Sequence, residues 1–161
     1  MHDYLKQRLS NEKRAETFVY LFTHKGAASF TEIFKGGPEN HYGTAHAEEL
    51  QYLFPIRKDL SYFFNSIPTD DDKKLSKLIT ELWVNFATTG NPTPDSSHFE
   101  KWTPATEFPL NYLRIGNANG ESKNLLSMEN DLYSERAEFW WNLKAHHPAN
   151  HKTKSLNKGE L

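Results

Sequence analysis

The sequence predicts an α/β fold whose sheet is incomplete. Residues 17–24 (TFVYLFTH) are a short run of β-branched and aromatic residues without charge, which is typical of a buried strand in a parallel sheet. Residues 69–89 place apolar side chains at helical intervals, which indicates an amphipathic helix. Only residues 111–116 (NYLRIG) give a second strand, and two strands alone form a marginal sheet. We therefore expect one end of a larger α/β fold, with the remaining strands missing from this chain.

Short elements surround the first strand. Residues 3–10 predict a helix, residues 36–40 (GGPEN) predict a loop, and residues 45–54 (AHAEELQYLF) predict a second short helix that ends at Pro55. The side chains expected on one side of the first helix are Tyr4, Leu5 and Leu9, and those expected to face inward from the second are Leu50, Leu53 and Phe54.

The helix at residues 69–89 has clear signals at both ends. The Thr69 hydroxyl can cap the free N–H groups of the first turn, and three aspartates follow it at the positive end of the helix dipole. Gly90 and Pro92 stop the helix. Its apolar stripe consists of Leu75, Leu78, Ile79, Leu82 and Phe86, widened by Trp83.

The C-terminal part divides at residue 144. Residues 130–144 predict a last helix, so residues 1–144 form the folded part, and residues 145–161 are a polar tail that we expect to be disordered. Aromatic side chains at helical spacing usually pack in a core. The aromatic residues expected there are Trp83, Phe86, Trp102, Trp140 and Trp141.

Composition excludes several functional classes. The chain has 161 residues and a formal net charge of -2, so it lacks the excess of positive charge that is typical of proteins that bind nucleic acids. It has no cysteine, which rules out a disulfide framework and a thiol nucleophile. No apolar run approaches the length of a membrane span.

His46 is the candidate functional residue. It follows Gly43 by three positions at the start of a predicted helix. It could simply begin the helix or pack in the core, or it could act as a general base carried on a flexible loop. A metal site would need His46 with Glu49 or His41 and at least one further ligand, and no complementary cluster is present in the body of the chain, so we expect no metal.

The segment from Gly43 to Phe54 (GTAHAEELQYLF) resembles the catalytic-histidine segment of the type-B carboxylesterases, a family that includes the cholinesterases. Residues 83–92 (WVNFATTGNP) match another motif of that family, and Val19–Gly26 is similar to the strand before the histidine. Further matches follow in the family's order at Lys101–Pro104, Asn111–Leu113 and Phe139–Trp141.

This resemblance implies an α/β-hydrolase fold, of which this chain would be the C-terminal portion. It implies that His46 is the last member of a Ser–Glu/Asp–His triad, with Gly43 and Glu49 as candidate supporting residues. For Glu49, the alternative is that it only places charge in the first turn of a helix. The implied activity is hydrolysis of small carboxylic esters without a cofactor.

The chain departs from the family pattern in two respects. It has no G-x-S-x-G motif, and no acidic residue before the strand matches the family's triad acid. We therefore expect the chain alone to be inactive. The rival interpretation is a non-catalytic, esterase-like adhesion module, since the family also contains such proteins.

The sequence also gives an expectation about location. The last four residues, Lys158–Leu161 (KGEL), resemble the tetrapeptide that a receptor reads to retain proteins in the endoplasmic reticulum. Gly159 replaces the usual aspartate. We expect the lumen of the endoplasmic reticulum, with secretion as the alternative.

Overall fold

The computed structural model describes residues 2–11, 15–32, 42–54 and 66–146. A three-stranded sheet forms its centre, in the order β1 (Tyr20–Phe22), β2 (Asn111–Ile115) and β3 (Leu126–Asn130). Strands β1 and β2 are parallel, with Tyr20 opposite Leu113, and β3 runs antiparallel to β2. The helical elements are α1 (His2–Leu9), α3 (Leu50–Leu53), α5 (Asp70–Thr89), the 3₁₀ turn η1 (Ala118–Gly120) and α6 (Ser134–His146).

Helix α5 confirms the prediction for residues 69–89 at both ends. The Thr69 side chain accepts a hydrogen bond from the Asp72 amide, and the Asp72 carboxylate accepts one from the Thr69 amide, which completes a capping box. Gly90 ends the helix in the left-handed conformation, at a φ of 77°. This helix therefore has a defined start and register before tertiary packing is considered.

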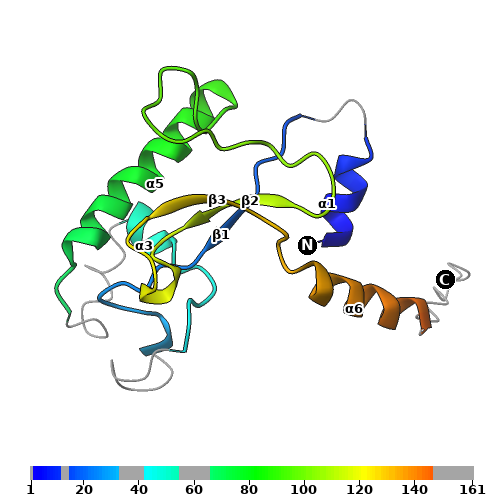
Figure 1. Ribbon diagram of the computed structural model, residues 1–161. Helices are drawn as coiled ribbons and strands as arrows, with labels where there is room; N and C mark the ends of the chain where they lie inside the picture. The colour runs from blue at the N-terminus through cyan, green and yellow to red at the C-terminus, as the bar shows by residue number, and fades with distance from the viewer. Residues whose placement is uncertain (1, 12–14, 33–41, 55–65, 147–161) are drawn as a thin grey trace, which may run out of the picture.

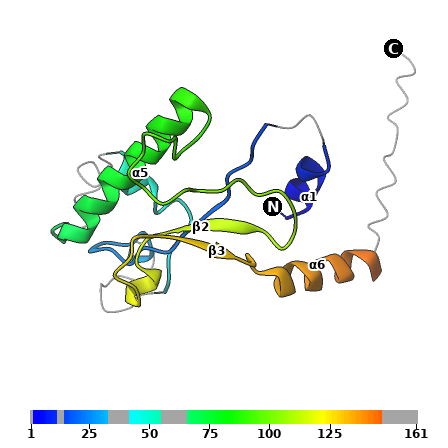
Figure 2. The same cartoon turned by 45° about the horizontal axis from the view of Figure 1, so that its top comes forward.

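Two hydrophobic clusters hold the elements together. The larger one packs α3 and α5 against the sheet, and the smaller one packs α1 against β2 and the segments around it. Figures 1 and 2 show α5 beside the sheet, with α1 and α6 beyond its opposite end. The larger cluster comprises Tyr52, Leu75, Ile79, Leu82, Trp102, Leu113, Ile115 and Leu125, and the smaller comprises Leu5, Leu9, Val19, Ala105, Leu110, Tyr112 and Leu132.

The sheet both confirms and corrects the predicted strands. The parallel pairing expected for residues 17–24 is present, and residues 111–115 form β2. All three residues of β1 are only half-buried in this chain, and no described strand pairs with its second edge. The count of two strands is wrong, because LSMEN (Leu126–Asn130) forms β3. That segment has no β-branched or aromatic residue, so its own sequence gives little signal for a strand.

The helix predicted for residues 45–54 is shorter than expected. Regular helix is confined to Leu50–Leu53, because Ala47 has a φ of 66°, which an α-helix cannot contain. The inward face is also different. Gln51 and Tyr52 are the buried residues, and Phe54 is 57% exposed.

The C-terminal predictions have mixed outcomes. The last helix is present as α6, although it begins at Ser134 rather than residue 130. Trp102 is buried as expected, but Phe86 is 48% exposed and Trp140 is 63% exposed. Leu5 and Leu9 are buried in α1, while Tyr4 is exposed. The predicted loop at residues 36–40, Pro55 and residues 147–161, including Lys158–Leu161, lie outside the described residues. No helix among the described residues is long and apolar enough to cross a membrane.

Candidate active site

His46 lies on a turn near the carboxyl ends of the two parallel strands. Two residues before it, the Thr44 hydroxyl donates a hydrogen bond of 3.2 Å to Asn119 Oδ1. Asn119 belongs to the turn η1, which follows β2, and its amide donates to the Thr23 carbonyl at the end of β1. Open α/β sheets bind their ligands at this edge. The His46 side chain is exposed there, and within the described ranges no carboxylate hydrogen-bonds to it.

Gly43 and Ala47 shape the turn around His46. Gly43 has a φ of 86°, a conformation that favours glycine. Ala47 has a φ of 66° and so adopts a left-handed conformation too, although its Cβ atom makes that conformation less favourable than it is for glycine. Residues in the left-handed region thus lie three positions before and one position after His46, whose side chain is exposed.

Glu48 fixes the turn to the segment that follows β1. Its side chain is buried, with 2% of the residue exposed. The Oε1 atom accepts a hydrogen bond from the Phe30 amide at 2.9 Å and another from the Ser29 hydroxyl. Ser29 is itself buried, and its amide donates to Glu32 Oε1. A buried carboxylate with these donors is anchored rather than solvated.

Glu49 contacts the sheet instead. Its carboxylate lies close enough to the Tyr20 hydroxyl on β1 to interact with it electrostatically. Burial raises the pKa of the Tyr20 hydroxyl, and the nearby negative charge of Glu49 raises it further. Glu49 also occupies the N-cap position of α3, without a side-chain capping bond.

A buried polar network joins the end of β1 to α3 and α5. His24 Nε2 lies 2.8 Å from Asp72 Oδ1, and the Tyr52 hydroxyl donates to the same oxygen over 3.3 Å. The amides of Thr69 and Ala27 donate to the other oxygen, Oδ2. Burial alone would raise the pKa of Asp72, but the hydrogen bonds from His24, Thr69 and Ala27 outweigh it and hold that pKa well below its usual range.

Two glycines allow this network to close. A Cβ atom on Gly26 would lie 2.1 Å from the Tyr52 hydroxyl and 2.5 Å from Asp72 Oδ1. A Cβ atom on Gly116, which has a φ of 116°, would lie 2.4 Å from the backbone nitrogen of His24. Both positions therefore need glycine because other groups approach the backbone closely.

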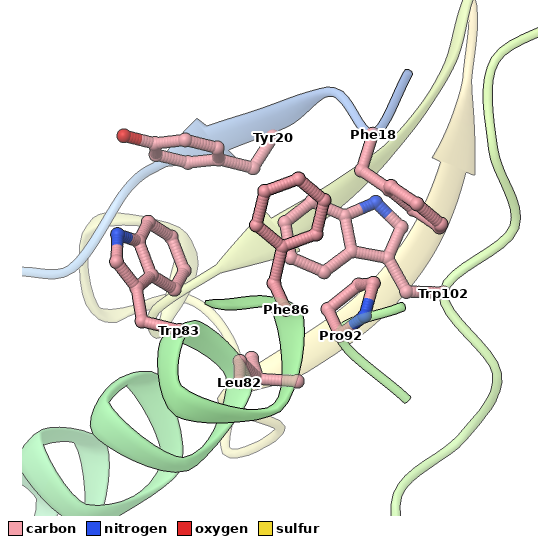
Figure 3. Close-up of a pocket in the computed structure, with 7 residues that line it drawn as sticks. All are labelled: Phe18, Tyr20, Leu82, Trp83, Phe86, Pro92 and Trp102. Carbon is pink, nitrogen blue, oxygen red and sulfur yellow. The ribbon is translucent and has the colours of Figure 1, made fainter. Parts of the chain in front are cut away.

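An apolar cavity of about 200 Å³ opens between β1 and α5 (Figure 3). Its lining is mostly aromatic, and two pairs of rings pack edge to face: the centroids of Tyr20 and Trp83 are 5.2 Å apart, and those of Phe18 and Trp102 are 5.7 Å apart. The lining residues are Phe18, Tyr20, Leu82, Trp83, Phe86, Pro92 and Trp102. Tyr20 thus connects this cavity to Glu49 and the His46 turn.

The sequence singled out His46, Gly43 and Glu49, and all three lie on this turn or at its end. It did not single out Glu48 or the network of His24, Asp72 and Tyr52. Two neighbouring acidic residues, Glu48 and Glu49, give no signal in the sequence as to which one is buried. Among the described residues no group of three or more metal-ligating side chains comes together.

Comparison with known proteins gives a family for this arrangement. Residues 1–140 match the carboxylesterase family. The chain belongs to that family. The small mixed sheet with flanking helices is accordingly part of an α/β-hydrolase fold.

Several curated relatives carry esterase or lipase names. The chain is 30% identical to a juvenile hormone esterase of Tribolium castaneum over 132 residues, which is 76% of this chain and 22% of that protein. It is 30% identical to the human bile salt-activated lipase over 139 residues, covering 84% of this chain and 16% of the lipase. It is 25% identical to an acetylcholinesterase of Bungarus fasciatus over 131 residues, covering 80% of this chain and 18% of the enzyme. The chain thus spans about a fifth of the length of these relatives.

Proposed function

We propose that His46 is the general base of a serine esterase that hydrolyses carboxylic esters, and that this chain supplies the C-terminal portion of that enzyme. The observation that supports this best is the position of His46. In a chain of the carboxylesterase family, its imidazole stands exposed on an anchored turn at the carboxyl ends of parallel strands. Ligands of α/β sheets bind at such an edge.

In this proposal His46 moves protons between the reacting groups. The imidazole takes the proton from the serine hydroxyl as that oxygen attacks the ester carbonyl, and it then gives the proton to the departing alcohol. The serine and the acidic triad member come from the part of the enzyme outside this chain. Gly43 and Glu49 support the turn, the first by its positive φ and the second through the Tyr20 hydroxyl. No cofactor is needed.

We assign residues 1–144 to the esterase domain and residues 145–161 to a polar tail. The rest of the domain would add strands to the unpaired edge of β1 and cover the aromatic cavity beside it. Two features support this assignment. Every residue of β1 is half-buried although the segment is strongly apolar, and Phe86 on α5 is 48% exposed although it lines the cavity. Apolar surface of this kind usually marks an interface.

The test uses the full-length protein and short-chain p-nitrophenyl esters. We expect turnover in the presence of a metal chelator and complete loss of turnover once a fluorophosphonate has labelled one serine per molecule. A non-catalytic adhesion protein is the alternative. Absence of both turnover and labelling in a well-folded full-length protein would favour it.

The cellular location of the protein is predicted from its C-terminal sequence. The Lys158–Leu161 segment favours the lumen of the endoplasmic reticulum, with secretion as the alternative. A secreted reporter carrying residues 145–161 at its C-terminus should be retained in cells, and unimpeded secretion of that reporter would contradict retention.

A further inference from the structure

We propose that Glu48 is a positioning residue for His46, and that its hydrogen bonds to Ser29 and Phe30 keep the imidazole in the position that catalysis requires. This inference rests on the proposed role of His46 as the base. Glu48 and Glu49 are neighbours in sequence but act in different places: Glu48 is hydrogen-bonded to the segment after β1, and Glu49 lies near Tyr20 on β1.

The contacts of Glu48 carry the inference. The side chain is buried beside a polar segment, and its Oε1 atom accepts hydrogen bonds from the Phe30 amide and the Ser29 hydroxyl. Ser29 is 6% exposed, and Ala28 before it is 2% exposed. Glu48 is therefore attached to the buried segment that follows β1.

The position of Glu48 in the chain makes the attachment effective. Only Ala47 separates it from His46, and two residues span at most about 7 Å of chain. On the other side of His46, Thr44 is hydrogen-bonded to Asn119. His46 thus lies between two hydrogen-bonded side chains, Thr44 and Glu48, which are four positions apart, and Glu48 is the buried one of the two.

The second anchor system lies farther from His46. Beyond Glu48, the Tyr52 hydroxyl donates to Asp72, and the Ser76 hydroxyl donates to the Tyr52 carbonyl at 2.6 Å. These contacts fix α3 to α5. Both contacts involve Tyr52, which lies four residues beyond Glu48, so Glu48 is the buried anchor nearer to His46 in the chain.

The predicted effect is on the catalytic step. Displacement of a catalytic group by about 1 Å can cost about 100-fold in rate. In the full-length enzyme, Glu48→Ala should therefore lower kcat by about 100-fold and leave KM unchanged. Glu48→Gln keeps an oxygen that can accept from both donors, and should recover about tenfold of that loss, since neutral hydrogen bonds are about half as strong as charge-assisted ones.

Three further variants complete the experiment, with kcat measured on the monodisperse, folded fraction of each protein. Ser29→Ala removes one donor to Glu48, so its effect should not add to that of Glu48→Ala. Glu100→Ala changes an exposed glutamate of the same chain and should leave kcat unchanged. His46→Ala reports whether His46 is the base at all.

The outcomes separate the two proposals. Turnover in His46→Ala would overturn the role of His46 and this inference with it. An inactive His46→Ala beside a Glu48→Ala enzyme of nearly normal kcat would overturn only the role of Glu48. If Glu48→Ala does not fold, the isosteric Glu48→Gln and Ser29→Ala still decide, because normal kcat in both would contradict the role of these hydrogen bonds.

Discussion

The carboxylate of Asp72 gives the most specific prediction about stability. All four groups around it donate: His24 Nε2 and the Tyr52 hydroxyl to Oδ1, and the amides of Thr69 and Ala27 to Oδ2. Because Asp72 is ionised at neutral pH, His24 must carry its proton on Nε2. His24 Nδ1 is buried and has no hydrogen-bond partner in the described part of the chain.

Asp72→Asn keeps the shape of the side chain but replaces one acceptor by a donor. If the new NH₂ group faces Thr69 and Ala27, two backbone N–H groups lose their acceptor. If it faces His24, that ring must move its proton to Nδ1, where a buried N–H then has no partner. Hydrogen bonds to charged groups contribute about 1.5–3 kcal/mol and an unsatisfied buried donor costs about 1–3 kcal/mol. We therefore expect a local destabilisation of about 2–4 kcal/mol.

The assay is native-state hydrogen exchange of the α5 amides in the full-length protein. Since about 1.4 kcal/mol is a factor of ten, protection should fall by roughly 30- to 1000-fold in Asp72→Asn. Asp71→Asn, an exposed change in the same helical turn, is the matched control and should cost under about 1 kcal/mol through the helix dipole. Equal protection in the two variants would refute the reasoning.

Further predictions concern pH, the turn and the cavity. The lowered pKa of Asp72 makes its contribution to stability complete above its ordinary value of 3.8, and this contribution is lost progressively as pH falls from there to the lower folded value. The stability gap between wild type and Asp72→Asn should therefore begin to narrow below about pH 4 and keep narrowing at lower pH, and a constant gap on acid titration would contradict this. Burial and Glu129 raise the pKa of Tyr112 to about 12, so its contribution is complete below about 10 and lost between about 10 and 12, a loss that Tyr112→Phe should not show in alkaline unfolding. Ala47→Val should destabilise the protein by about 1–2 kcal/mol and Ala47→Gly should not, because β-branched residues disfavour the positive φ of this position. Thermal unfolding of the two variants measures this difference. Phe86→Asp should abolish soluble expression of the full-length protein, because it would place a charge in a cavity that the rest of the domain covers. Thr80→Asp, at an exposed position of α5, is the control and should express normally. Equal solubility of the two variants would exclude burial of the cavity against the rest of the domain.

Local sequence signals were sufficient for α5 and for the parallel strand pair. Thr69 and Asp72 cap the start of α5 and Gly90 ends it, each through hydrogen bonds to residues three or four positions away, so these capping roles depend little on the rest of the fold. The position of β2 was also predictable, because NYLRI contains Tyr112 and Ile115, two residues that favour strands. The resemblance to the carboxylesterases was also confirmed by the family match.

Tertiary contacts decided what the sequence did not predict. β3 forms on β2 although LSMEN has little strand character of its own, because the pairing from Leu126 to Asn130 satisfies the second edge of β2. Asp72 was expected only to complement the helix dipole, but its burial depends on His24, which lies 48 residues away in sequence. In the same way, the difference between Glu48 and Glu49 arises from Ser29 and Tyr20, which no local pattern connects to them.

The role of His46 as the base is tested most directly by His46→Ala in the full-length protein, with kcat/KM for a p-nitrophenyl ester as the readout. Loss of a triad member removes nearly all of the rate enhancement. We predict a fall of about 10⁴-fold or more at an unchanged melting temperature. His98→Ala, at an exposed histidine on the same chain, should keep wild-type activity. An activity of His46→Ala comparable to that of His98→Ala would contradict the assignment of His46 as the catalytic base.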